Sequence, residues 1–389
     1  MHRLNEFEHA ERNSLGPRTL VACFALLAWV SGCPMTEQSE PSFADAPLAS
    51  RDGVTRTYET ELIRLGSLGK GDVVHIRVEG SKVVTVLVLR FRDEQEDSAV
   101  ILSGGVVDVA FDFRAPQEGK HFLFVLFDPT ASVLTRRASV TVGPGDERFS
   151  PPQEQCVLVR FEPNFLTDPG LIDPDMPDAG ERRELLESLA SDVREGILER
   201  LQVIFEGTPV RIIDADVAPP PNEPCSMVLF SPDRVVAPDA LAADAVIPSF
   251  ASDIPECDEI VIFGEVLPRG TNVDPGNRNR HDKAVVYVGS FQGSGEPCQT
   301  AAADSIHAIT FGLAHTAAHE IGHLLGFYHV PLIDIMDRRP NLAFTRELEF
   351  GPGQLLLELP TANGKEVTTR IITAVYQDPE AYFEANFGP

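Results

Sequence analysis

Five of the ten histidines in this 389-residue chain lie between His307 and His329. From His319 to His329 the sequence is HEIGHLLGFYH. Residues four apart lie on the same face of a helix, so His319 and His323 can direct one ring nitrogen each to a common point. Gly326 can then end the helix in a left-handed turn, which glycine adopts without strain, and return His329 to the pair. A helix that ends in a turn is therefore required here, and three imidazoles are predicted to converge.

Three neutral imidazoles suit Zn²⁺, which binds histidine nitrogen at about 2.0–2.1 Å. Three protein ligands leave a fourth position open, as in catalytic zinc sites and unlike structural ones. Glu320 follows the first of these histidines in the chain and is a candidate to take a proton from water at that open position. We therefore expect His319, His323 and His329 to bind zinc and Glu320 to act as a general base.

The stretch HEIGHLLGFYH resembles the extended zinc-binding motif of the metzincin peptidases. These enzymes also have a Met turn beneath the zinc, and the following IDIMD at 333–337 offers Met336 for that role. The resemblance implies a metzincin-like α+β catalytic domain with a mixed sheet and an active-site helix. It does not identify a subfamily, because Arg338 and Val330 stand where some metzincins have a tyrosine and an aspartate.

The expected function is that of a zinc-dependent endopeptidase acting on a protein or peptide substrate. Glu320 would take the proton of the zinc-bound water and pass it to the leaving amine. The substrate is expected to pair, as an extended strand, with an edge strand near Gly264–Asn272. The alternative is a non-catalytic, zinc-containing surface binding or adhesion lipoprotein, although the complete set of ligands and Glu320 argues against a decayed site.

The charge of the chain excludes another class of function. The sequence has 32 basic and 59 acidic residues, for a formal net charge of −27. Such a chain repels nucleic acids and anionic membrane surfaces. We expect no nucleic-acid partner, and no pattern in the sequence indicates an oligomeric state.

Two patterns divide the rest of the chain into domains. Residues 55–145 contain short valine-rich runs that alternate apolar and polar residues, which predicts an antiparallel β-sandwich. A stretch rich in proline and glycine at 143–155 marks the boundary. From 155 to 389, strand-like runs are combined with helical patterns at Glu181–Phe205 and Ala303–Leu325. This order predicts the α+β zinc metallopeptidase domain.

The N-terminus predicts export. The apolar run Thr19–Val30 follows arginines, as in a secretory signal, and is shorter than the roughly 20 residues that span a bilayer. Val30–Cys33 resembles a bacterial lipobox, which implies a signal peptide over 1–32 and lipid on Cys33. An ordinary signal peptide is the alternative. Residues 33–54 are expected to form a flexible tether. The expected location is the bacterial cell envelope, anchored by lipid to the outer membrane or cell surface, or else the secreted fraction.

The other candidate sites are less specific. Four cysteines beyond residue 150 suggest disulfides in an exported chain, and of the three possible pairings we expect Cys225 with Cys257 and Cys156 with Cys298. A loop at 274–282 carries oxygen ligands of the kind that Ca²⁺ prefers, with a solvated turn as the default. Its candidate residues are Asp274, Asn277, Asn279 and Asp282. Three further side chains lie near the zinc motif. His315 could approach the site, but we expect it to pack or to support the ligands; we expect His307 to have no role. Tyr328 could hydrogen-bond a substrate, but we expect it to pack.

Overall fold

The computed structural model describes residues 44–45, 54–58, 62–80, 83–92, 98–106, 110–127, 137–166, 179–217, 222–233, 235–237, 249–252, 260–267, 273–291, 306–330, 334–336, 348–351, 353–354 and 374–387. All of them belong to one compact unit, Phe43–Pro389. The predicted signal peptide and Cys33 lie outside the described residues. No helix among the described residues is long and apolar enough to cross a membrane.

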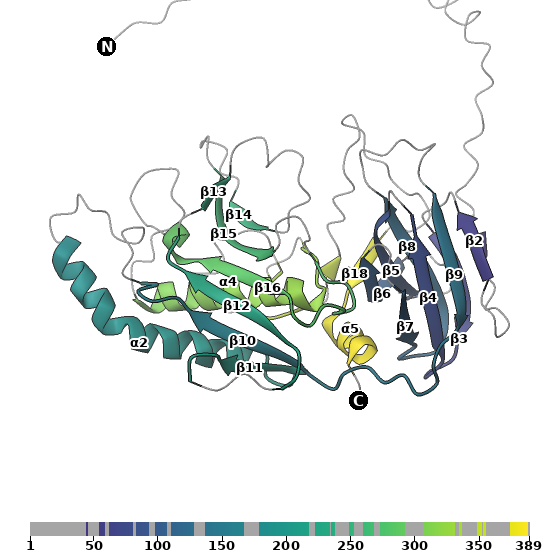
Figure 1. Cartoon of the computed structure of the whole chain (residues 1–389), viewed down its shortest axis with the longest axis horizontal. Coiled ribbons are helices and arrows are strands. Elements are labelled where there is room, and N and C mark those ends of the chain that lie inside the picture. The colour runs from purple at the N-terminus through teal and green to yellow at the C-terminus, as the bar shows by residue number, and fades with distance from the viewer. Residues whose placement is uncertain are drawn as a thin grey trace, which may run out of the picture. The chain divides into compact units, whose positions relative to one another are not determined.

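Strands of the N-terminal part of the unit form two largely antiparallel sheets, and two C-terminal strands join the first of them (Figure 1). The first has the strand order β1-β3-β8-β5-β6-β18-β17, in which only the β1–β3 and β6–β18 neighbours are parallel. The second has the order β2-β9-β4-β7. The strands are β1 Ala44–Asp45, β2 Val54–Tyr58, β3 Leu62–Leu68, β4 Val73–Glu79, β5 Val83–Phe91, β6 Ser98–Val106, β7 Ala110–Arg114, β8 Gly119–Phe127, β9 Ala138–Pro144, β17 Gly353–Gln354 and β18 Ala374–Gln377.

The alternating residues of these strands explain why the two sheets share one hydrophobic cluster. In β4, for example, Val74, Ile76 and Val78 are buried while the residues between them are more exposed. A strand turns successive side chains to opposite faces, so burial of every second residue gives β4 one apolar face. Apolar residues of β3, β5, β6 and β8 join those of β4, β7 and β9 in the same cluster.

A third sheet is mixed. Its order is β11-β10-β12-β16-β15-β13, and β14 also pairs with β15. The first four strands are parallel neighbours, whereas β15 runs antiparallel to β16, β13 and β14. The strands are β10 Gln155–Phe161, β11 Val210–Asp214, β12 Cys225–Ser231, β13 Val235–Ala237, β14 Ser249–Ser252, β15 Ile260–Leu267 and β16 Lys283–Tyr287. The predicted α+β class is therefore confirmed.

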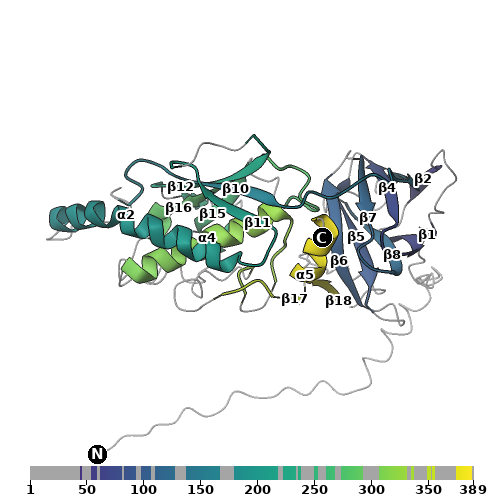
Figure 2. The same ribbon diagram turned by 90° about the horizontal axis from the view of Figure 1, so that it is seen from below.

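Two long helices, α2 (Ala179–Ile204) and α4 (Ile306–Leu325), pack side by side, and α4 also packs on β15 and β16 (Figures 1 and 2). Val193, Ile197 and Leu201 recur every four residues of α2 and are fully buried. Gly196 permits the close approach, because a Cβ atom there would lie 2.8 Å from Thr310 of α4. Both helices start and end within about three residues of the ranges predicted from the sequence.

The C-terminal segment returns to the first sheet. Strand β18 pairs in parallel with β6, and helix α5 (Pro379–Asn386) follows it directly. Asp378 caps α5, because its carboxylate accepts hydrogen bonds from the backbone N–H groups of Glu380 and Ala381. Pro379 occupies the first turn, where its missing N–H costs nothing. Residues far apart in the sequence thus meet at β6.

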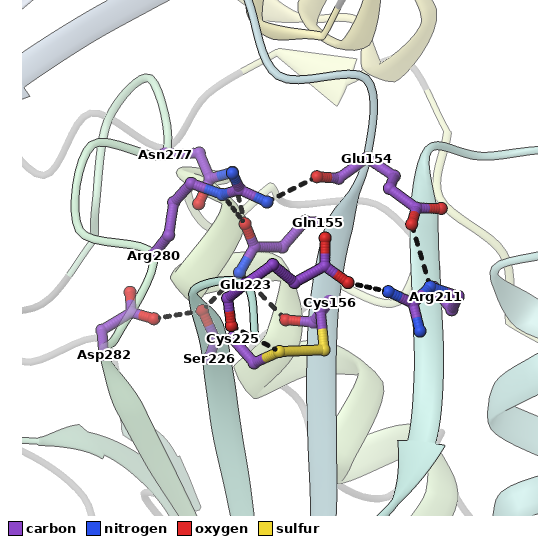
Figure 3. Close-up of a disulfide and its surroundings, with 10 residues drawn as sticks. All are labelled: Glu154, Gln155, Cys156, Arg211, Glu223, Cys225, Ser226, Asn277, Arg280 and Asp282. Carbon is purple, nitrogen blue, oxygen red and sulfur yellow. Dashed lines mark hydrogen bonds and ion pairs between the residues drawn. A yellow bond between two sulfur atoms is a disulfide. The ribbon is translucent and has the colours of Figure 1, made fainter. Parts of the chain in front are cut away.

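One disulfide joins Cys156 of β10 to Cys225 of β12 (Figure 3). The two strands are parallel neighbours and these cysteines are register partners, with Cα atoms 4.6 Å apart. The predicted pairings of Cys156 with Cys298 and of Cys225 with Cys257 are therefore wrong. Sequence spacing could not show that β10 and β12 are adjacent. Cys257 and Cys298 lie outside the described residues.

A buried histidine in β8 makes the stability of the fold depend on pH. His121 is 1% exposed, its Nδ1 lies 2.8 Å from the Gly119 carbonyl oxygen, and burial lowers its pKa from 6.5 to about 4. The unfolded chain therefore binds a proton that the folded chain does not between these pH values. The contribution of the neutral His121 ring to the free energy of unfolding is fully present above pH 6.5 and is lost as the pH falls towards 4.

We expect His121→Asn to remove this dependence, because the amide can still donate to Gly119 but does not titrate. Between pH 6 and 5 the free energy of unfolding of the wild type should fall by up to about 1.4 kcal/mol more than that of the variant. Urea unfolding of both proteins in the same chelating buffer measures the difference. Parallel curves would show that His121 titrates normally in the folded chain.

Candidate metal centre

The turn after α4 brings the third histidine back to the helix. Gly326 has a φ of 102°, the left-handed region, and its N–H donates to the His323 carbonyl at 3.0 Å. Its missing Cβ is also required by space, because the Tyr382 hydroxyl and the Asp274 carbonyl oxygen occupy that position. The predicted helix end at Gly326 is confirmed, and the chain beyond it carries His329 to the other two histidines.

Three imidazole nitrogens converge at the end of α4. The Nε2 atoms of His319 and His323 lie 3.1 Å apart, and they lie 3.1 and 3.2 Å from Nε2 of His329. His319 and His323 are fully buried, and His329 is partly exposed. In the part of the chain that is described, no other group of three histidine, cysteine, aspartate or glutamate side chains comes close enough to hold one metal ion.

The other ring nitrogens fix the direction of this convergence. Nδ1 of His319 lies 2.6 Å from the Ile335 carbonyl oxygen, and Nδ1 of His323 lies 2.8 Å from the Phe327 carbonyl oxygen. A carbonyl only accepts hydrogen bonds, so each Nδ1 carries the proton. In the neutral rings both Nε2 atoms then present lone pairs to each other. A cation between them removes that repulsion, as in metal sites whose histidines are oriented by a second hydrogen bond.

Burial keeps two of these rings in the form that binds metal. Desolvation lowers the pKa of His319 to about 4, against the opposing effect of its bond to Ile335. The pKa of His323 is lowered well below its usual value, first by burial and then by the charge of His319. Both imidazoles are therefore neutral near pH 7, which is the state required of a metal ligand.

The distances fit zinc. Three nitrogens at about 2.0–2.1 Å from a tetrahedral zinc are about 3.4 Å apart. The observed separations of 3.1–3.2 Å leave a point about 2.0–2.1 Å from all three nitrogens, roughly 1 Å outside their plane. The set contains three nitrogen donors and no fourth protein ligand among the described residues. This composition suits a metal with one position open to solvent or substrate.

Met336 lies in a tight turn that packs on Gly322 of α4. It is 1% exposed, and a Cβ on Gly322 of α4 would collide with its sulfur. The neighbouring Ile335 supplies the carbonyl bonded by His319. Asp334 holds the turn, because its carboxylate accepts from the Met336 N–H at 2.8 Å. The turn therefore both supports α4 and orients one of the predicted ligands.

Glu320 is fully buried and faces the sheet above α4. A Cβ on Gly264 of β15 would lie 2.6 Å from its Oε1 and 2.8 Å from its Cγ. A side chain at position 264 would therefore push the carboxylate aside. The carboxylate is not part of the converging histidine group, which agrees with a base and not with a ligand.

The remaining histidines near the motif pack elsewhere. His315, 2% exposed, lies 3.5 Å from an Arg200 guanidinium nitrogen of α2 and edge-on to Phe311. His307 is exposed and contacts the same phenylalanine. The Tyr328 hydroxyl bonds to a threonine of β5, and burial raises its pKa above the usual range. None of them joins the three converging rings.

The loop at 274–282 is a turn in which two of the candidate side chains bond to the loop's own backbone. Side-chain oxygens of Asp274 and Asn279 accept hydrogen bonds from backbone N–H groups of the loop at 2.7 and 3.3 Å. Asp282 instead accepts from the Ser226 hydroxyl at 2.5 Å (Figure 3). Burial raises the pKa of Asp274 to about 6 and that of Asp282 to about 8, which disfavours ionised calcium ligands. Calcium binding, including the role of Asn277, stays a prediction.

The strand expected to pair with substrate is paired on both sides over part of its length. Residues 261–265 of β15 pair with β14 along one edge and with β13 and β16 along the other. The prediction of an open edge is therefore wrong for Gly264 and Glu265, where the chain's own residues 249–252 take that place. The intervening β14 could not be foreseen because its four residues carry no strand pattern.

Comparisons with known proteins add no relative. No protein-family model and no curated protein matches the chain. Among solved structures, the chain is similar to the Yersinia pseudotuberculosis-derived mitogen, at 11% identity and a TM-score of 0.18. The match covers 26% of this chain and 92% of the mitogen. A TM-score this low carries no conclusion about fold or function.

We expect His323→Ala to lose most of its zinc, because two imidazoles hold the metal far more weakly than three. His315→Ala is the matched control, since it removes a buried histidine from the same helix outside the converging group. Metal analysis of both purified variants after dialysis tests the assignment. Zinc at one equivalent in His323→Ala would rule out His323 as a ligand.

Proposed function

We propose that the chain is a zinc-dependent endopeptidase of the metzincin type, with a β-sandwich module N-terminal to the catalytic domain. The observation that carries the proposal is the convergence of three Nε2 atoms within 3.2 Å, with Glu320 next in sequence to the first of them. Further support comes from Met336 in a turn beside the ligands and from α4 packed under a mixed sheet. The two N-terminal sheets with one common cluster are consistent with a sandwich.

Each residue has a defined task in this proposal. His319, His323 and His329 hold the metal and leave one position open. Bound zinc would polarise a substrate carbonyl and lower the pKa of water at that position towards about 7. The Glu320 carboxylate accepts the proton of the attacking water and delivers it to the amine that leaves. Its fixed place against Gly264 keeps it on the side of α4 that faces the sheet.

The substrate class follows from the chemistry of the site and from the charge of the chain. A hydrolytic zinc site with a carboxylate base suits the amide bond of a protein or peptide. The net charge of −27 disfavours nucleic-acid substrates. A cationic or neutral peptide would approach this surface more readily than an acidic one.

The test separates catalysis from metal binding. We expect the purified protein to cleave unfolded casein, to lose that activity with a chelator and to regain it with zinc. Glu320→Gln should keep one zinc per chain while its turnover falls by about 100-fold or more, because only the proton acceptor is removed. Wild-type turnover in Glu320→Gln would contradict the mechanism.

A second variant probes the position of the base without changing its chemistry. Gly264→Ala should keep zinc and lose activity by about 10-fold or more, because the new Cβ displaces the carboxylate. Gly180→Ala in α2 is the control, since a Cβ there meets nothing within 4 Å. A wild type that binds zinc but cleaves no peptide would favour the non-catalytic binding lipoprotein.

A further inference from the structure

A buried glutamine outside the zinc motif clamps the chain beside the third histidine. Gln377 ends β18 and is 2% exposed. Its Oε1 accepts from the Tyr328 N–H at 2.7 Å, and its Nε2 donates to the Tyr328 carbonyl oxygen at 3.3 Å. The side-chain amide of Gln377 thus bonds to both the N–H and the carbonyl of Tyr328, as the backbone of a neighbouring strand would.

Those two bonds matter because Tyr328 directly precedes His329. The residues after Gly326 lie outside the helix, so their polar groups need partners from elsewhere. On the other side of His329, the Val330 N–H donates to the Met336 carbonyl at 3.1 Å. The third imidazole is therefore held between two fixed residues: the Met turn fixes the one that follows, and Gln377 fixes the one that precedes.

Gln377 can act as a clamp because its own strand is anchored. Strand β18 pairs with β6 of the first sheet. Helix α5 continues from it, and Asn386 of this helix donates to the Leu102 carbonyl of β6 at 2.6 Å and accepts from the Ser103 hydroxyl at 2.6 Å. Tyr382 of α5 packs on the ring of Phe327, 4.9 Å between centroids. The support of the turn thus depends on β6, a strand that precedes the zinc motif by more than 200 residues in the sequence.

We propose that Gln377 is a positioning residue for the zinc ligand His329. The inference rests on the proposed zinc site but not on peptidase activity. It also links the N-terminal sheet to the metal centre. Strand β6 pairs with β18, and Gln377 at the end of β18 bonds to the turn at Tyr328. Removing the amide frees the Tyr328 peptide group and lets His329 leave the position that completes the site. Removing a group that hydrogen-bonds a ligating imidazole costs about 10- to 100-fold in metal affinity, and we expect a loss in the same range from removing this support of the backbone next to the ligand.

Gln377→Met tests the inference, because methionine has a similar length and makes neither hydrogen bond. Zinc affinity of the full chain is measured by competition with a chromophoric chelator, at a temperature well below the melting point of each variant. Gln155→Met in β10 is the matched control, since it makes the same substitution at another buried glutamine whose bonds reach neither β18, α5 nor residues 326–329. We expect affinity to fall by about 10- to 100-fold in Gln377→Met and to stay within about twofold of wild type in Gln155→Met.

Equal zinc affinity in Gln377→Met and wild type, with only a lower melting temperature, would overturn the inference. A similar loss of affinity in both variants would also overturn it, because the effect would then be general destabilisation. If Gln377→Met does not fold, Gln377→Glu serves instead: it keeps the acceptor for the Tyr328 N–H and places an oxygen against the Tyr328 carbonyl. It must still weaken zinc binding. A wild type with zinc but without peptidase activity would refute only the proposed function.

Discussion

Two neutral imidazoles that point their lone pairs at each other repel, and this constraint organises the structure around the end of α4. The bonds from Nδ1 of His319 and His323 to backbone carbonyls make Nε2 the acceptor of each neutral ring, and the two Nε2 atoms lie 3.1 Å apart. Burial prevents protonation from relieving the repulsion near pH 7, because it lowers both pKa values. A cation shared with His329 is the simplest way to stabilise the arrangement.

The residues around the three histidines hold them in their converging positions. Three glycines lie where an added Cβ atom would collide with a neighbour: Gly264 against Glu320, Gly322 against Met336 and Gly326 at the turn. Asp334 ties down the Met turn, and Gln377 ties down the residue before His329. These contacts come from separate segments of the chain, so the metal centre depends on the whole compact unit and not on the motif alone.

The sequence predicted the site far better than its support. The spacing of His319, His323, Gly326 and His329 encodes one helix and one turn, which are local structures, so the convergence could be derived. Strand alternation and helical spacing likewise gave the α+β class and both long helices. The partner of Cys156 depends on which strands become neighbours, and that long-range fact has no local pattern. The role of Gln377 could not be predicted from the sequence either, because a glutamine at the end of a short strand is common and its partner, Tyr328, is distant in the sequence.

The contrast between local patterns and long-range contacts also explains why the predicted edge strand was wrong. The pattern of β15 was visible, but the short β14 that covers its edge over residues 261–265 has no alternation to reveal it. The loop at 274–282 shows the reverse case, since its oxygen-rich composition suggested a cation while Asp274 and Asn279 already accept hydrogen bonds within the loop. Composition alone does not distinguish an oxygen that binds metal from one that already accepts a hydrogen bond.

The central claim is that three histidine nitrogens, and no other protein atoms, hold one zinc. X-ray absorption at the zinc K-edge tests it most directly on the full chain loaded with one equivalent of zinc. We predict a first shell of three imidazole nitrogens and one oxygen at about 2.0–2.1 Å, with the outer-shell scattering typical of imidazole rings. A sulfur at about 2.3 Å, or a first shell with fewer than three imidazoles, would contradict the account.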